Sequence, residues 1–429
     1  MSLPISDYAI IGDTHTTALV SREGSVDWLC WPRHDSPALF LRLLDDVKGG
    51  ACSIEFDGKT SVSRRYLPDT NIIETSFVQP GGRAVLTDFM PVNPPDSSPG
   101  QEPRGGLGGD AESRLIRLLA CTEGTVSGRF VVRPTFDYAR TGCTPHADQD
   151  GSALFEAGAH RVRVTSSRAV SVQGETASVV FRLAGGERMH LVLTQGRDGG
   201  VQGPDGAAMR LEQTARYWRE WVGPCTYRGK HAAAVRRSAL FLKLMTYSPT
   251  GAIIAAPTLG LPEAVPGNRN FDYRYAWLRD ASFTITAFVN LGFRHEAEAY
   301  LRFLCKVDDS HGRELRLMYG ICDPVPDEQE LPHLSGWRQV GPVRIGNAAA
   351  EQTQHDIYGE LQLAVEDYCA AVGDEVPADL AEVLPPLVCN LAERAVAARN
   401  EPDQGLWESR GPPQHFVHTK ALIWVALDR

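Results

Sequence analysis

The chain has 429 residues, which corresponds to two or three domains at roughly 150 residues each. Hydrophobic residues make up 43% and charged residues 22%, so the composition excludes a wholly disordered protein. The 43 basic and 53 acidic residues give a formal net charge of −10, which argues against a general nucleic-acid binder.

The N-terminus and the cysteines indicate the cellular compartment of the protein. The first twenty residues lack the basic region and continuous apolar stretch of an export signal. No run of about 18 apolar residues occurs, so we expect a cytoplasmic protein that does not enter membranes. The nine cysteines are scattered, odd in number and without a CxxC pair, which predicts reduced core thiols rather than disulfides or a zinc site.

The N-terminal half has the pattern of β-strands. Short, partly alternating apolar stretches are separated by Gly and Asp turns, which favours an antiparallel β-sandwich domain over residues 1–215. Residues 94–110 are rich in Gly, Pro and Ser and are expected to form a flexible loop. The predicted strands cover residues 72–78, 114–120, 129–132, 161–164, 177–183 and 189–193.

The second half has the period of α-helices. A Gly223-Pro224 break interrupts the pattern, and we assign residues 216–230 to a helical linker and 231–429 to a helical domain. Long connections rich in Gly, Pro and aromatic residues join the helices, and such loops often carry functional sites. The predicted helices cover residues 207–221, 231–247, 273–291, 294–307, 353–371, 378–399 and 416–427.

The richest cluster of candidate site residues stands at the start of the helix predicted from residue 273. Tyr273, Trp277 and Asp280 share one face of that helix, with Arg279 beside them. Aromatic rings pack against the C–H side of a sugar ring, while Arg and Asp bind adjacent hydroxyls, so this combination suits a sugar. The alternative is a buried Arg–Asp pair within an aromatic core.

A second candidate is Glu408, which follows Trp407 in the connection between two predicted helices. A carboxyl group packed against an indole loses hydration, which raises its pKa and keeps it protonated near neutral pH. Such a group would serve as a general acid. The alternative is a solvated loop carboxylate.

A third stretch places Trp337, Arg344 and Asn347 where they could line a cleft. Gln352 and Asp356 follow, four residues apart, and are expected to share one face of the next helix. An exposed loop with a helix cap at Asn347 explains the same residues.

The sequence indicates no cofactor and no metal. It holds no Walker loop, no GxGxxG and no GxSxG elbow. His415 and His418 lack ligand spacing with other His or Cys residues, so we expect them to be core or surface histidines.

Four blocks of this sequence resemble the bacterial branch of glycoside hydrolase family 15, which holds glucoamylases, glucodextranases and trehalases. The resemblance runs from about residue 4 to the last residue. The blocks are PISDYAIIGDTHTTALVSREGSVDWLCWPRHDSPALF, NRNFDYRYAWLRDASFT, LPHLSGWRQVGPVRIGNAAAEQTQHDIYGE and GLWESRGPPQHFVHTKALIWVALDR.

The resemblance implies an N-terminal β-sandwich, a following (α/α)6 barrel, and inverting hydrolysis of α-glucosidic bonds. It implies that Glu408 is the general acid and that Trp407 lines the same pocket. Starch-acting relatives often carry a second Glu after the acid, whereas this chain has Ser409, so a preference for long maltooligosaccharides is not expected. The residues that match the positions holding the glucose are Tyr273, Trp277, Arg279 and Asp280.

The family barrel has twelve helices, and this sequence predicts about seven, with no match to the catalytic base. We interpret the chain as a truncated barrel of which about the first half is present. Its open apolar face predicts aggregation or a homo-oligomer. The expected function is inverting hydrolysis of small glucosides (trehalose, malto- or isomalto-oligosaccharides) that releases glucose, with the general base missing from this chain. The alternatives are an inverting disaccharide phosphorylase and a non-catalytic sugar-binding remnant.

Overall fold

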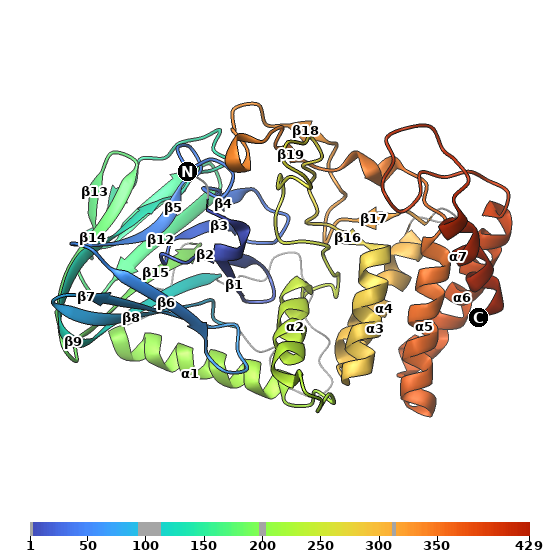
Figure 1. Cartoon of the computed structure of the whole chain (residues 1–429), viewed down its shortest axis with the longest axis horizontal. Helices are drawn as coiled ribbons and strands as arrows, with labels where there is room; N and C mark the ends of the chain where they lie inside the picture. Colours follow the sequence, from blue (N-terminus) through green and yellow to red (C-terminus); the bar gives the residue numbers. More distant parts are fainter. Residues whose placement is uncertain (1–2, 93–112, 197–202, 311–314) are drawn as a thin grey trace. The chain divides into compact units, whose positions relative to one another are not determined.

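The computed structural model describes residues 3–92, 113–196, 203–310 and 315–429, so the loop predicted for 94–110 lies outside the described residues (Figure 1). The chain forms two compact units, which do not coincide with the predicted segments 1–215, 216–230 and 231–429, because two loops of the predicted helical domain belong to the first unit. The β unit comprises Met1–Gly223, Gly260–Asn270 and Leu331–Val343, and the helical unit comprises Pro224–Leu259, Phe271–Glu330 and Arg344–Arg429.

The β unit is built on one antiparallel sheet, whose main path runs β1-β2-β3-β5-β9-β15-β12-β11-β10. Short 3₁₀ turns lie at Ile5–Asp7 and Trp337–Gln339, and helix α1 spans Gly203–Val222. The strands are β1 (Tyr8–Gly12), β2 (Thr17–Ser21), β3 (Val26–Cys30), β4 (Ala38–Phe40), β5 (Ala51–Phe56), β6 (Ser61–Tyr66), β7 (Ile73–Gln79), β8 (Gly82–Phe89), β9 (Arg114–Arg133), β10 (His146–Ala147), β11 (Ala153–Ala157), β12 (His160–Ser166), β13 (Ser171–Gln173), β14 (Thr176–Ala184) and β15 (Arg188–Gln195).

Strand β9 joins the two halves of this sheet. The sequence predicted separate strands at 114–120 and 129–132, whereas the structure has one strand of 20 residues. Gly124 adopts a φ of +65° in the middle of β9, where an added Cβ would lie 2.1 Å from the Gly81 carbonyl oxygen, so the turn-like sequence there is a local irregularity within the strand. The first half of β9 pairs with β8 and β15, and the second half pairs with β5 and β14.

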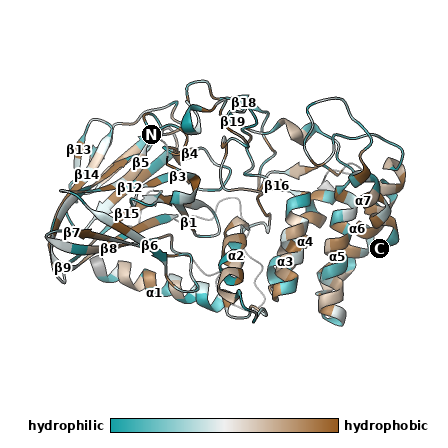
Figure 2. Ribbon diagram, in the orientation of Figure 1, coloured by the Kyte–Doolittle hydropathy of each residue, from teal (hydrophilic) through white to brown (hydrophobic). Residues whose placement is uncertain are grey.

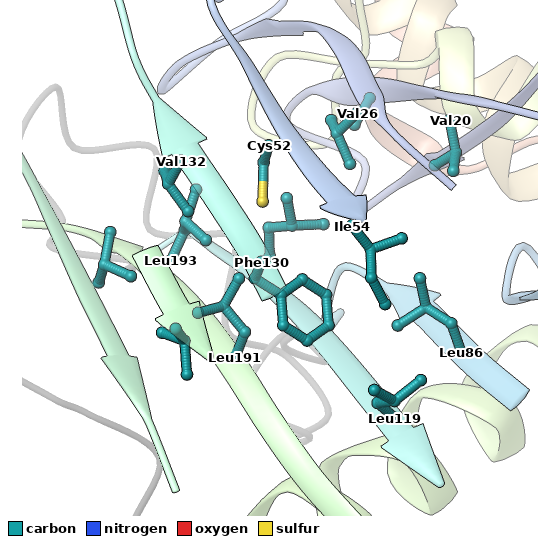
Figure 3. Packing of buried hydrophobic residues seen from close by; sticks show 14 of the residues in the cluster. Val20, Val26, Cys52, Ile54, Leu86, Leu119, Phe130, Val132, Leu191 and Leu193 are labelled. Carbon is teal, nitrogen blue, oxygen red and sulfur yellow. The ribbon is translucent and has the colours of Figure 1, made fainter. Parts of the chain in front are cut away.

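Side-chain alternation along β9 divides the apolar residues between two clusters. Leu115, Leu119 and Phe130 belong to the main core, which contains residues from both halves of the sheet. Figure 3 shows Phe130 among Leu119, Leu191 and Ile54 in this core. Ile116 faces the other way and packs with residues of α1. The predicted antiparallel β-domain is therefore confirmed, and its two halves share one core, as in a sandwich.

A buried ion pair lies within the β unit. The side chain of Arg117 points to the same face of β9 as Leu115 and Leu119. Its Nε lies 2.8 Å from Oδ1 of Asp88, and both side chains are fully buried. Arg117 also donates to the carbonyl oxygen of Cys52 at 2.6 Å. A buried charge is tolerated only when it is paired and hydrogen-bonded, which this arrangement provides.

Trp337, which the sequence placed beside a cleft, belongs to the β unit. Its side chain is buried, and its Nε1 donates to the carbonyl oxygen of Leu3 at 3.0 Å. The backbone N–H of nearby Ser335 donates to Asp45 at 3.0 Å. Trp337 thus packs in a different unit from Arg344 and Asn347, with which it was grouped.

The helical unit consists mainly of helices near the predicted positions (Figure 1). Short strands β16 (Ala276–Trp277) and β17 (Met318–Tyr319) pair, as do β18 (Gln329–Glu330) and β19 (Arg344–Ile345). Short 3₁₀ turns lie at Ala348–Glu351 and Gly373–Glu375. The helices are α2 (Ala232–Met245), α3 (Leu278–Leu291), α4 (Arg294–Ser310), α5 (Ile357–Val372), α6 (Ala378–Ala398) and α7 (Val417–Asp428).

Helix α5 packs against α3, α6 and α7. Ten of its residues are buried, and Figure 2 shows hydrophobic residues along it. Gly359 allows the approach of α7, because an added Cβ would lie 2.1 Å from the carbonyl oxygen of Leu422. The absence of a side chain at this position therefore allows the first turn of α5 to approach α7 closely.

Two helices begin later than predicted. Helix α3 begins at Leu278 rather than at residue 273, because Ala276 and Trp277 are extended and pair with β17. Helix α5 begins at Ile357 rather than at residue 353. In both cases the residues before the helix make long-range contacts that local periodicity does not encode.

None of the helices in the described part of the chain is both long enough and apolar enough to cross a bilayer. Of the nine cysteines, five are buried, whereas Cys389 on α6 is exposed. The prediction of core thiols therefore holds for only part of them.

Candidate functional site

The candidate site is built around Arg279, in the first turn of α3. Its Nη1 donates to Oε1 of Gln354 at 2.6 Å and to Oδ2 of Asp356 at 3.1 Å. Asp356 is fully buried and immediately precedes α5. The guanidinium group thus connects α3 to the start of α5 through a charge-assisted hydrogen bond.

The same guanidinium group reaches the loop that carries Glu408. Nη2 of Arg279 donates to the carbonyl oxygen of Leu406 at 3.3 Å, two residues before Glu408. Glu408 is 8% exposed, so it is not the solvated loop carboxylate that was the alternative. Its φ of +53° is uncommon for a residue with a Cβ, and such backbone conformations often occur at functional sites.

Trp407 does not occupy the position that the sequence predicted, packed against Glu408. Its side chain is 78% exposed, so the indole expected to desolvate Glu408 is itself turned largely to solvent. The burial of Glu408 comes from the way its loop is folded onto the helical unit.

Asp403 anchors that loop, and the sequence analysis gave it no role. Its Oδ2 accepts hydrogen bonds from the backbone N–H of His355 at 3.0 Å and from Oγ1 of Thr419 at 2.9 Å. Its Oδ1 accepts from the N–H of Gly405 at 3.2 Å. One buried carboxylate therefore holds the loop to the segment before α5 and to the first turn of α7. A buried Asp before a Gly-containing turn is the only local signal that could have identified it.

Gln352 closes the other side of the loop. Its Nε2 donates to the carbonyl oxygen of Ser409 at 3.2 Å, and its Oε1 accepts from Gln354 at 3.1 Å. The sequence predicted that Gln352 and Asp356 share a helix face. They instead precede α5, with Gln352 in extended backbone and Asp356 at the N-cap of the helix, and contact the site from there.

Tyr273 and Trp277 precede α3 rather than lying on it. Their ring centroids are nevertheless 5.8 Å apart, so the two aromatic residues are adjacent as predicted. Trp277 is buried, and no hydrogen-bond acceptor among the described residues reaches its Nε1. Tyr273 is half-buried.

The buried Arg–Asp pair considered as an alternative exists, but it involves neighbouring residues. Nε of Arg274 donates to Oδ1 of Asp272 at 2.9 Å, and Nη2 donates to Oδ2 at 2.8 Å, with both side chains fully buried. This bidentate pair is structural. Arg279 also forms a largely buried pair, with Asp356, whereas Asp280 is exposed at the start of α3.

Asn347 and Arg344 are engaged by other parts of the protein. The amide oxygen of Asn347 accepts from the N–H of Ala349 at 2.9 Å, so this residue caps the following 3₁₀ turn. Its Nδ2 donates to the carbonyl oxygen of Asp272 at 3.2 Å. Arg344 forms an ion pair with Glu330 at 3.0 Å. These contacts support the alternative explanation of this stretch, a capped loop, and the structure does not bring either residue to Arg279.

The site has a dense negative charge. Asp280 opens to solvent, yet the surrounding atoms restrict its hydration and raise its pKa, an effect that Arg279 opposes. Glu360, in the first turn of α5, is 5% exposed. Burial, together with the charge of Asp356, raises the pKa of Glu360 to about 8, so it keeps a proton near neutral pH.

Comparison with known proteins agrees with this geometry. Residues 229–429 match the model of glycosyl hydrolases family 15, and residues 1–101 match that of the trehalase-like N-terminal domain. Trehalase 1 of Sulfolobus acidocaldarius is 31% identical over 435 residues, which cover all of this chain and 71% of that protein. The chain belongs to glycosyl hydrolase family 15.

Other members of family 15 extend beyond the aligned region. The trehalase of Mycolicibacterium smegmatis is 37% identical over 99% of this chain, which spans 65% of that protein's length. The solved structure of a bacterial glucoamylase complexed with acarbose is 12% identical in sequence and superimposes with a TM-score of 0.60. The aligned region covers 95% of this chain and 60% of the glucoamylase chain. This likeness establishes that the family-15 chain has a glucoamylase-like fold, with an antiparallel β-domain and a helical domain.

Proposed function

We propose that this chain belongs to an enzyme that hydrolyses α-glucosidic bonds in small glucosides and releases glucose, with trehalose as the first substrate to test. The observation that carries the proposal is the hydrogen bond from Arg279 to the Leu406 carbonyl oxygen at 3.3 Å. It connects the residues proposed to hold the sugar with the loop that presents Glu408. The names of the trehalase relatives support the choice of trehalose.

In this proposal Arg279 and Asp280 bind adjacent sugar hydroxyls, one as donor and the other as acceptor. Asp356 and Gln354 fix the orientation of Arg279 before substrate binds, which reduces the entropy lost on binding. Half-buried Tyr273 offers its ring surface to the sugar, and the buried Trp277 packs beside it. Glu408 protonates the glycosidic oxygen as the bond breaks. The sequence analysis also expected Trp407, Arg344 and Asn347 to line the substrate pocket, and the proposal gives none of them a contact with the sugar.

We further propose that hydrolysis inverts the anomeric configuration and that helices α2 to α7 belong to an (α/α)6 barrel, about half of which lies in this sequence. Inversion requires a second carboxylate about 6.5 to 9.5 Å from the acid, with water between them. The proposal assigns no residue of this sequence to that role. A cytoplasmic location and self-association remain parts of the proposal.

The test replaces Glu408 with Gln in the full-length protein and measures trehalose hydrolysis and trehalose binding. We expect turnover to fall by a factor of about 10² to 10⁴, the usual contribution of a general acid, while binding changes little. Glu401→Gln, which alters an exposed carboxylate in the same connection, is the matched control. Full turnover in Glu408→Gln would refute the assignment. Cleavage that requires inorganic phosphate and releases a sugar phosphate would instead identify a phosphorylase.

A further inference from the structure

Asp356, Glu360 and His418 come together from two helices. Each offers one ligand atom, and these atoms lie within 4.8 Å of one another. Nδ1 of His418 lies 3.7 Å from Oδ2 of Asp356. Asp356 and Glu360 come from the start of α5, and His418 from the first turn of α7, which meet where Gly359 permits close contact. His418 has no other His or Cys at ligand spacing in the sequence, so the sequence alone did not indicate this cluster.

Two acceptor atoms of the cluster are buried without a partner. Across the described residues, no hydrogen-bond donor reaches Oδ1 of Asp356 or Oε2 of Glu360. Asp356 is 0% and Glu360 is 5% exposed. A buried carboxylate oxygen without a donor is costly, so a group that binds both oxygens is expected at this position.

Charge favours a cation over a sugar hydroxyl as that group. The cluster and the neighbouring Asp280 bring three carboxyl groups together, and Arg279 pairs with one of them, Asp356. A hydroxyl group would satisfy one acceptor but would not neutralise charge. A divalent cation would bind both unpartnered oxygens and displace the proton of Glu360.

We propose that Asp356, Glu360 and His418 form a binding site for a divalent transition-metal ion, Mn²⁺ or Zn²⁺. One imidazole nitrogen with two carboxylate oxygens suits these ions better than Mg²⁺ or Ca²⁺, which prefer oxygen ligands alone. His418 is 41% exposed, so the solvent side of the site leaves coordination positions open. The proposal departs from the sequence-based expectation that His418 is a core or surface histidine. The site shares Asp356 with the proposed sugar site, but its test is separate from the proposed hydrolysis because metal binding is measured without turnover.

The experiment measures Mn²⁺ binding to the full-length, metal-stripped protein by electron paramagnetic resonance, with Zn²⁺ as a competitor. We expect one saturable Mn²⁺ per chain, displaced by Zn²⁺. Glu360→Gln and His418→Ala should each weaken binding about tenfold or more, because each removes a ligand. His418 lies at the surface, so its variant tests the site even if Glu360→Gln impairs folding.

The matched controls are Glu366→Gln, which alters a partly exposed carboxylate on the same helix α5, and His415→Ala, which alters an exposed histidine three residues before His418. Both should bind Mn²⁺ within about twofold of the parent, because neither residue reaches the cluster. Absence of saturable binding of either ion at millimolar concentration would overturn the proposal. Equal binding by the parent and both ligand variants would do the same.

Discussion

Arg279 pairs with Asp356, 77 residues away along the chain, at 3.1 Å, although Asp280 is its neighbour in sequence. Asp356 has no exposure to solvent, so its charge depends on this guanidinium group. Arg279, which we propose binds the sugar, is thus also part of the packing between α3 and α5.

Removing either partner of this pair should affect stability and binding together. We expect Arg279→Ala to lower the free energy of unfolding by about 3 to 5 kcal/mol, because Asp356 is left buried without its cation. Glucoside binding should be lost as well. In the double variant Arg279→Gln with Asp356→Asn, neutralisation of both charges should restore much of the stability but not the binding. Urea unfolding and calorimetric titration with trehalose measure the two effects.

Arg302→Ala is the control for this pair, since its ion pair with Asp379 is solvent-exposed and should contribute less than about 1 kcal/mol. If Arg279→Ala retained parental stability and affinity, neither the pair nor the sugar site could have the importance assigned here.

Asp403 should act as a positioning residue for Glu408. In Asp403→Ala the loop loses its hydrogen bonds to His355, Gly405 and Thr419, so Glu408 is no longer held in place. We expect kcat for trehalose to fall at least about tenfold while KM changes little, with a stability loss of about 1 to 3 kcal/mol. Asp374→Ala, at an exposed position, provides the comparison. An unchanged kcat in the folded Asp403→Ala variant would contradict this role.

Gly359→Ala should destabilise the protein, although Gly to Ala in a helix usually stabilises it. The added Cβ would lie 2.1 Å from the Leu422 carbonyl oxygen, so α5 and α7 must move apart. We expect the free energy of unfolding to decrease by about 1 to 3 kcal/mol. Gly411→Ala, in an exposed loop with its nearest neighbour atom at 3.4 Å, should change it little. A gain in stability for Gly359→Ala would mean that the helices are not in close contact there.

His190 should make the stability of the protein depend on pH. It lies on β15 with 3% exposure, and burial lowers its pKa. Below the unfolded-state pKa of about 6.5, the unfolded chain binds a proton that the native state does not, so the free energy of unfolding decreases as pH falls. His190→Gln should flatten this dependence between about pH 7 and 5.

Urea denaturation at several pH values tests this effect, with His295→Gln as the control because that side chain is 95% exposed. The same slope for the parent and His190→Gln would show that other groups cause the pH dependence.

Local sequence patterns located most of the fold. The alternation of apolar residues located the strands, and the helical period placed α6 from Ala378 despite Pro385 and Pro386. The prediction failed where distant contacts decide the local structure. Leu278, rather than Tyr273, begins α3 because Trp277 pairs with Met318, and β9 continues through a segment that resembles a turn.

The sequence also singled out Arg279, Asp280 and Glu408 as candidate site residues, from side-chain chemistry at short spacing and from the resemblance to family 15. It did not identify Asp403, Glu360 or His418, whose roles depend on neighbours tens of residues away. Only the tertiary structure brings the starts of α3, α5 and α7 together and buries carboxylates there. Burial and proximity change the pKa of Glu360 and the pairing of Asp356, and neither property belongs to a residue until the chain is folded.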